Sequence, residues 1–352
     1  MVLIKRLKGP FAIFLYKKLL VLLITFFFSA TLLFVVPRLL PSSPVDMMLA
    51  RLGLGGGFSS GGAASTAPVE ILKKIYTEKF GLDKSVEIQF LDFWIRIFTM
   101  DFGVSFFRFP TRVVDLIISA LPWTLILVIP VPLAGFLVGN WIGSRVAFNN
   151  KSRLNNLLYY AALYASLLPY YWFALILVYA FAVNLKWFPV YGAYSNRWLN
   201  PVLSFEWFLD AAYHWILPFL SLIGVGIGGW AIGMRASIES QLRSTYVEYS
   251  KKIGFSPGKL RKYMQRNAIL PNFTWLPMTF AYLLSQTLLV EVVFGYPGLG
   301  TLMYNAAYSS DYPLLEATFV VLMLIVLGGN CICDIIYGIL DPTIGSRYIS
   351  SE

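Results

Sequence analysis

The stretch YVEYSKKIGFSPGKLRKYMQRNAILP (Tyr246–Pro271) is a polar, basic insert between two strongly apolar blocks of the chain. A glutamate, Glu248, stands six residues before a glycine, Gly254. Because glycine adopts backbone conformations that other residues avoid, we predict a cytoplasmic loop of two short helices hinged at Gly254. An Ile-Leu-Pro triplet closes the stretch, made of Ile269, Leu270 and Pro271.

Local pairings support both predicted helices. Glu248 and Lys252 are four residues apart, in the favourable orientation for an ion pair on the first helix. Ser256 and Pro257 suit the cap and first-turn positions of the second helix. A serine hydroxyl can accept an unpaired backbone N–H there, and proline has no N–H to lose.

Composition places the chain in a membrane. It is 58% hydrophobic and 13% charged, with a mean hydropathy of +0.68, whereas soluble domains carry about 25% charged residues. Uncharged stretches of roughly 20 residues, long enough to cross a ~30 Å hydrocarbon core as helices, recur along the sequence. We therefore predict an all-α polytopic membrane protein.

Several other classes are disfavoured. The net charge of +10 is concentrated between apolar blocks rather than on a basic face with exposed aromatics, so nucleic acid is not an expected partner. Cys331 and Cys333 point to different faces of one apolar helix and have no neighbouring metal ligands. We expect the single histidine, His214, to be structural, and we predict neither a metal site nor a catalytic residue.

The first span follows a basic leader. Residues Leu19–Pro37 carry no charge, and this run is too long for a signal peptide and lacks a cleavage site, so we predict a retained helix within residues 1–37. Lysines and an arginine before it place the N-terminus in the cytoplasm by the positive-inside rule.

Residues 38–112 are predicted to form an extracytoplasmic loop subdomain. Gly53–Thr66 contains six glycines and reads as a flexible linker. Pro68–Phe80 and Val86–Thr99 are predicted to be soluble amphipathic helices. We favour a small packed cap over the helix ends, with direct substrate contact as the alternative.

The remaining core, residues 113–345, is predicted to hold five further spans. With six spans in all, both termini are predicted to lie in the cytoplasm, and residues 346–352 form a cytoplasmic tail. The basic loop Arg235–Arg266, with eight Lys or Arg residues, lies on that side. The spans are Leu116–Ser144, Leu157–Val183 (broken by Pro169), Ala211–Met234, Asn272–Val290 and Ala317–Cys333.

Residue types within the spans predict close packing and bends. Prolines in the second span should kink it toward protein or a cavity. The tyrosines and tryptophan of the third span either pack or line a substrate path, and we favour packing. Small residues in the fourth span predict close contact with a helix of this chain or of a partner, through Gly224, Gly228, Gly229 and Gly233.

The basic stretch Tyr246–Pro271 resembles the EAA loop of ABC importer permeases, which docks into a cleft on the ATPase subunit. The match places the coupling role on Glu248, Tyr249, Ser250 and Gly254, and on the triplet Ile269, Leu270 and Pro271. The family usually has alanines where this chain has Tyr249 and Ser250. The long spacing from glycine to proline resembles the oligopeptide/dipeptide branch.

Other motifs extend the resemblance from about Phe80 to Ile344. Val293–Gly300 is similar to the family's VFSIPGLG, and Leu185–Val190 to its LGWLPV. A third motif, DYP, and a C-terminal D..Y...DPR also have counterparts; Tyr296 replaces an isoleucine and Thr343 an arginine. The matching residues that we expect to be structural are Pro297, Gly298, Gly300, Asp311, Tyr312, Pro313, Asp341 and Pro342.

The resemblance implies six transmembrane helices of the type I ABC importer kind in the cell membrane. It also implies a second, similar permease, two ABC ATPase subunits and an external solute-binding protein. ATP and magnesium would bind to the partner subunits, and no cofactor is expected here. The glycine-containing segment at Gly254–Leu260 is too short for a P-loop and has leucine where Ser or Thr must reach magnesium.

Few ionisable residues lie inside the predicted spans, which disfavours coupling to protons or sodium. The function expected from the resemblance is ATP-driven import of short peptides, with oligosaccharides as the alternative substrate. A channel or membrane scaffold without an ATPase is the rival class, but it leaves the polar loop unexplained. We predict that a bulky substitution at Gly254 abolishes transport and leaves membrane insertion intact.

Overall fold

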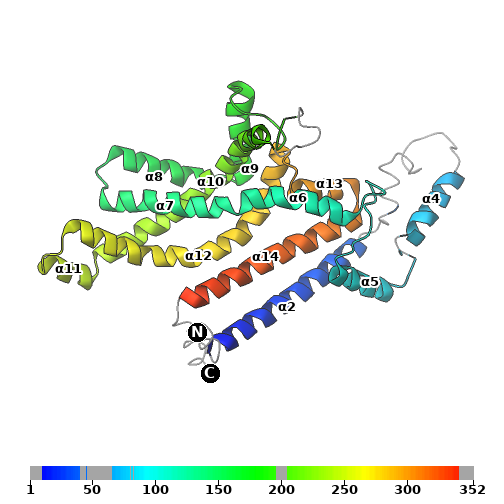
Figure 1. The fold of residues 1–352 in the computed structure, drawn as a ribbon, viewed down its shortest axis with the longest axis horizontal. Helices are drawn as coiled ribbons and strands as arrows, with labels where there is room; N and C mark the ends of the chain where they lie inside the picture. Colours follow the sequence, from blue (N-terminus) through cyan, green and yellow to red (C-terminus); the bar gives the residue numbers. More distant parts are fainter. Residues whose placement is uncertain are drawn as a thin grey trace. The chain divides into compact units, whose positions relative to one another are not determined.

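The structure is a computed structural model that describes residues 10–39, 45, 66–79, 81, 83–195 and 204–340 (Figure 1). Helices make up nearly all of this part, and its β-structure is one isolated bridge between Val104 and Arg112. The all-α prediction is confirmed. The main helices are α2 (Pro10–Arg38), α4 (Thr66–Lys79), α5 (Val86–Thr99), α6 (Val113–Val128), α7 (Pro130–Phe148), α8 (Arg153–Ala165), α9 (Tyr170–Leu177), the π-helix η1 (Val178–Asn184), α10 (Phe205–Leu242), α11 (Thr245–Lys252), α12 (Pro257–Phe294), α13 (Leu299–Ser309) and α14 (Tyr312–Leu340).

Five helices of the described residues are long and apolar enough to cross a membrane. A sixth span results if the bent pair α8 and α9–η1 is counted as one, with an angle of 113° between its halves. Pro169 caps the start of α9 at this bend, as predicted for the third span. The second span is interrupted only at Ile129, before Pro130.

The described residues form two compact units. One contains those within Met1–Pro122 and Thr301–Cys331, and the other those within Trp123–Gly300 and Ile332–Asp341. The domain boundaries inferred from the sequence stay predictions. The predicted linker Gly53–Thr66 lies outside the described residues except for Thr66, as does the C-terminal tail.

In the first unit, the buried carboxylate of Asp311 joins the start of α14 to residues 105–107. Ser105 donates its hydroxyl to Asp311 Oδ2, and the backbone N–H groups of Phe106 and Phe107 donate at 3.1 and 3.2 Å. Asp311 also accepts the N–H of Leu314 at 3.3 Å, so it caps α14. These bonds give the Asp-Tyr-Pro motif a structural role, with Tyr312 and Pro313 starting the helix.

In the second unit, α10 packs closely on α7. A Cβ added at Gly139 would lie 2.8 Å from the carbonyl oxygen of Ile227, and one at Gly143 would lie 3.0 Å from Met234 Cβ. Gly224 and Gly228 of α10 are equally crowded, by Phe173 and by Ser166. The close contacts predicted for Gly224 and Gly228 are therefore made within this chain.

The predicted boundary between the second helix of the loop and the fifth span is wrong. The second helix of the loop is not short, because α12 continues for 38 residues through Pro271 and Pro277. Proline inside a membrane helix is tolerated where neighbouring helices hold the backbone in place. Asn272, the next residue, bonds to both α7 and α10 and supplies this support.

Candidate translocation cavity and coupling turn

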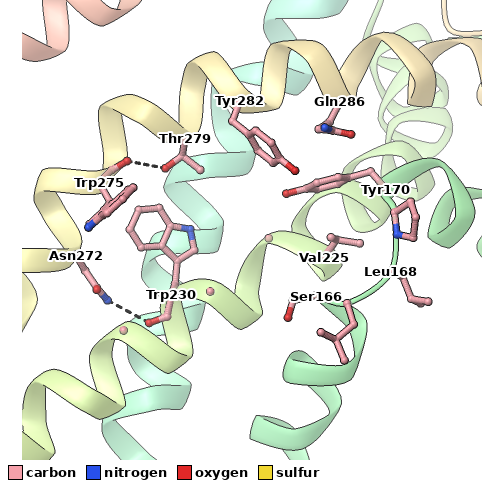
Figure 2. A pocket seen from close by; sticks show the side chains of 15 residues that line it. Ser166, Leu168, Tyr170, Val225, Trp230, Asn272, Trp275, Thr279, Tyr282 and Gln286 are labelled. Carbon is pink, nitrogen blue, oxygen red and sulfur yellow. Dashed lines mark hydrogen bonds between the residues drawn. The ribbon is translucent and has the colours of Figure 1, made fainter.

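A cavity of about 780 Å³ opens in the second unit between the α8–α9 connection, α10 and α12 (Figure 2). Aromatic rings and uncharged polar groups dominate its wall, and no Asp, Glu, Lys or Arg is among the described residues that line it. Gly229 lies on this face and has no atom within 4 Å of an added Cβ, so it leaves the wall open instead of packing as predicted.

Two tyrosines face each other at one end of the cavity. The rings of Tyr170 and Tyr282 are 6.2 Å apart and inclined at 61° (Figure 2). Gln286 lies one turn beyond Tyr282 on α12, and Thr279 lies on the other side, bonded to the carbonyl of Trp275 at 2.9 Å. This wall therefore offers aromatic faces together with amide and hydroxyl groups.

Asn272 closes the opposite end of the cavity. Its Nδ2 donates to Asn140 Oδ1 at 2.6 Å and to the carbonyl oxygen of Trp230 at 3.1 Å. The side chain is only 6% exposed, and an added Cβ at Gly233 would overlap its Oδ1. Asn272 thus connects α12 to α7 and α10 at one point. Asn272 is not among the residues predicted from the sequence, although an asparagine directly after proline in an apolar run is a usable signal.

The turn between α11 and α12 has the geometry predicted for a glycine hinge. Gly254 has φ +85°, a left-handed conformation that L-residues rarely adopt. Its N–H donates to Lys251 O at 3.2 Å, and the N–H of Phe255 donates to Ser250 O at 3.0 Å. Ser256 occupies the predicted cap position, but its hydroxyl makes no capping bond, which corrects that detail.

A small core holds α11 against the start of α12. Val247 is fully buried with Leu260 and Met264, and Phe148 from the end of α7 packs on them. Val247 is not among the residues predicted from the sequence, although its polar neighbours are. A single valine on an otherwise polar helix is the signal that could have identified it.

The other side of the turn faces outward. Glu248 and Lys252 form the predicted ion pair at 2.8 Å, and both side chains are largely exposed. Four large side chains around them are also exposed and define what we call the turn patch: Tyr249, Ile253, Phe255 and Tyr263.

The predicted coupling residues fall into two places. Glu248, Tyr249 and Ser250 lie on α11, and Gly254 follows it. The triplet Ile269–Pro271 lies inside α12, more than one helical turn beyond Met264, and joins the Val247 core to Asn272. The triplet is therefore part of the connection to the cavity rather than of the turn.

At the far end of α12, a second buried carboxylate holds the Pro-Gly turn. Thr124 donates to Glu291 Oε1 at 2.7 Å and accepts the N–H of Leu299 at 2.8 Å. The N–H of Gly300 donates to Glu291 Oε2 at 2.6 Å. An added Cβ at Gly298 would overlap the Glu291 carboxylate, which explains the glycine.

Other residues named from the sequence have structural surroundings or are not described. Pro297 is exposed in the turn, and the fully buried Tyr296 packs edge-on against Trp123 at 5.5 Å. His214 Nδ1 lies 2.9 Å from Asp210 O, as expected for a structural histidine. Asp341 and Pro342 lie outside the described residues, as do the side chains of the rest of that motif.

Membrane-length helices around an uncharged cavity, with a polar turn at the end of one of them, define a polytopic transport protein. Residues 139–346 match the family described as "binding-protein-dependent transport system inner membrane component". The chain belongs to this family and is a permease component of ABC-type import systems.

Curated relatives span nearly the same length. The chain is 31% identical to the oligopeptide transport system permease protein AppB of Bacillus subtilis, over 76% of this chain and 84% of AppB. It is 30% identical to OppB of Haemophilus influenzae, an oligopeptide transport system permease protein, over 94% and 98% of the two chains. It is 26% identical to YejB of Agrobacterium fabrum, named a peptidoglycan transport system permease protein, over 88% and 92%.

Proposed function

We propose that this chain forms half of the translocation pathway for short peptides in an ATP-driven importer. The observation that carries the proposal is the uncharged cavity, with two facing tyrosines, two tryptophans and a few amide and hydroxyl groups. Peptides of different sequence have their backbone amides in common. Neutral polar groups can bind those amides, while aromatic walls accept varied side chains. The names of the relatives support the same substrate class.

The turn between α11 and α12 is proposed to receive the movement of the ATPase. The turn patch offers apolar and aromatic groups that a partner cleft could bury. Glu248, Tyr249, Ser250 and Gly254 would form this contact. We expect the exposed Lys251 to contribute little specific binding.

Helix α12 provides a direct route from this turn to the cavity. At 1.5 Å per residue its 38 residues extend over about 57 Å. The same helix carries Leu260 in the Val247 core, Ile269–Pro271, Asn272 at one end of the cavity and Glu291 beyond it. A displacement of the turn would therefore move the cavity wall through one continuous helix.

The remaining parts of the machine are proposed from the family. A second, similar permease would supply the other half of the pathway, two ATPase subunits would bind ATP and magnesium, and an external binding protein would deliver the peptide. This chain would have no nucleotide site and no cofactor of its own. Both termini would lie in the cytoplasm, with the chain in the plasma membrane.

The substrate class is tested by uptake in cells or vesicles that contain the complete transporter. A radiolabelled tri- or tetrapeptide should enter in an ATP-dependent manner, and excess unlabelled peptides of different sequence should compete. Matched oligosaccharides should not compete. Inhibition by oligosaccharides but not by peptides would assign the alternative substrate and overturn this part of the proposal.

Replacing Tyr282 with alanine, compared with phenylalanine at the same position, tests whether the cavity lies on the path. Alanine should reduce peptide uptake because it removes an aromatic wall, whereas phenylalanine retains the ring and should preserve most activity. Equal uptake by both variants would exclude this cavity from the pathway.

A further inference from the structure

The outward face of α5 is apolar. Four large side chains, Ile88, Leu91, Ile95 and Phe98, are 47–78% exposed. They are spaced by three, four and three residues, so they share one face of the helix. We call this surface the α5 stripe.

Three polar side chains at the centre of α5 turn away from this stripe, toward Arg38 and Glu316 of the same unit. Gln89, Asp92 and Arg96 are less exposed than the stripe and line a small polar pocket of about 50 Å³ together with Arg38 and Glu316. Arg38 donates to Gln89 Oε1 at 3.2 and 3.3 Å and lies 3.5 Å from Glu316 Oε1. A helix surrounded by water would turn these groups outward and the apolar groups inward.

Packing against α2 places α5 beside a membrane span. Trp94 stacks on Phe27 of α2 with ring centroids 5.3 Å apart and an interplanar angle of 14°, and meets Phe26 edge-on at 6.0 Å. The candidate span of α2 ends at Val36, nine residues beyond Phe27. At ~1.5 Å per residue, Trp94 therefore lies about 14 Å inside the end of that span.

The surfaces of the two helices are continuous. Phe27 is 49% exposed, and Phe28 and Leu32 on the same span are more than 60% exposed. The surface of a candidate span with such residues is suited to lipid acyl chains. The α5 stripe extends this apolar surface sideways from the candidate span.

We propose that α5 lies within the outer leaflet of the bilayer, with the α5 stripe against lipid acyl chains. The segment after the first span is then anchored in the membrane by α5 instead of standing above it as a soluble cap. The choice of the outer leaflet rests on the proposed cytoplasmic N-terminus. The contact with acyl chains itself rests only on the exposure, the polar pocket and the ring contacts within the first unit.

Cysteine accessibility tests the proposal in native membrane vesicles that contain the assembled transporter. The background carries Cys331→Ser and Cys333→Ser. Single cysteines are introduced as Leu91→Cys and Phe98→Cys. Glu87→Cys on the same helix is the control, because Glu87 is a charged, exposed residue in the first turn of α5.

A membrane-impermeant maleimide should label both stripe cysteines at least about tenfold more slowly than the control. Maleimide reacts with the thiolate, and an apolar surrounding that raises a thiol pKa by one unit lowers the thiolate fraction about tenfold. A nitroxide attached at the same positions should be relaxed more by oxygen than by a water-soluble nickel chelate. It should behave like one at Phe28→Cys, a lipid-facing reference on α2.

Labelling at the control rate would show that the stripe faces water and would overturn the proposal. Low accessibility to both oxygen and the nickel chelate would show that a protein subunit covers the stripe, which also overturns it. Ile95→Cys provides a second stripe position if either variant fails to assemble. ATP-dependent peptide uptake by each variant is measured separately, so loss of transport and failure of the lipid contact can be distinguished.

Discussion

Replacing Gly254 with valine should uncouple ATP hydrolysis from transport without preventing membrane insertion. Gly254 has φ +85°, and a Cβ built there has no atom within 4 Å. The penalty for a side chain at this position is therefore conformational rather than steric. A left-handed conformation costs an L-residue roughly 1–2 kcal/mol, and a β-branched residue is at the upper end.

In Gly254→Val, we expect the turn to relieve this strain by breaking its hydrogen bonds to the carbonyl oxygens of Lys251 and Ser250. Breaking these bonds displaces α11 from α12. A penalty of 1–2 kcal/mol lowers the ratio of the intact to the opened turn by a factor of roughly 5–30. If the intact turn is required for coupling, uptake should fall by up to this factor, and by the full factor when the opened turn is the more populated state. This is a large reduction, although smaller than the complete loss expected from the sequence.

Gly258 provides a matched control four residues along the chain. It too has no atom within 4 Å of an added Cβ, but it does not have a positive φ. Gly258→Val should therefore retain most uptake, and Gly254→Asn should be intermediate because asparagine tolerates the left-handed region.

The assay is ATP-dependent peptide uptake in proteoliposomes, with ATP hydrolysis measured in parallel and insertion checked by membrane fractionation. Normal uptake by Gly254→Val would refute the coupling role of this turn. An equal loss in Gly254→Val and Gly258→Val would refute the conformational explanation.

Three further predictions concern stability and are measured by thermal unfolding of the purified transporter in detergent. Thr124→Val removes one donor from the buried Glu291 carboxylate and should lower the free energy of unfolding by about 2–4 kcal/mol. Thr124→Ser keeps the hydrogen bond, so equal stability of the two variants would show that this bond does not stabilise the protein. Asp311→Ala leaves the donors of residues 105–107 without their acceptor and should destabilise the first unit by on the order of 3–5 kcal/mol. Faster proteolysis around residues 105–107 is a second readout. Lys186→Gly should stabilise the protein by about 0.5–1 kcal/mol because Lys186 has φ +55°; a loss of stability would show that its side chain contributes more than its backbone strain.

Local sequence patterns were sufficient to predict the spans and the turn. Charge-free stretches identified the membrane helices, and Pro169 marked the bend between α8 and α9. Gly254 marked the left-handed turn, because that conformation depends on a single residue. These features are set by residues that are adjacent in the chain.

Contacts between distant segments could not be derived in the same way. Asn272 bonds to Asn140, and Glu291 bonds to Thr124, across more than one hundred residues. Which helices become neighbours depends on close packing through glycines, and the sequence leaves their partners open. The length of α12 could not be predicted for the same reason. The helix continues through Pro271 because the neighbouring Asn272 side chain binds two other helices.

The proposed mechanism depends on coupling between this permease and its ATPases through the α11–α12 turn. The most direct test is purification of the tagged protein in mild detergent, with quantitative mass spectrometry of what accompanies it. ATPase subunits and a second permease should co-purify in stoichiometric amounts, and Gly254→Val should weaken retention of the ATPase. Recovery of the chain alone, or as a homo-oligomer without an ATPase, would show that this coupling mechanism is wrong.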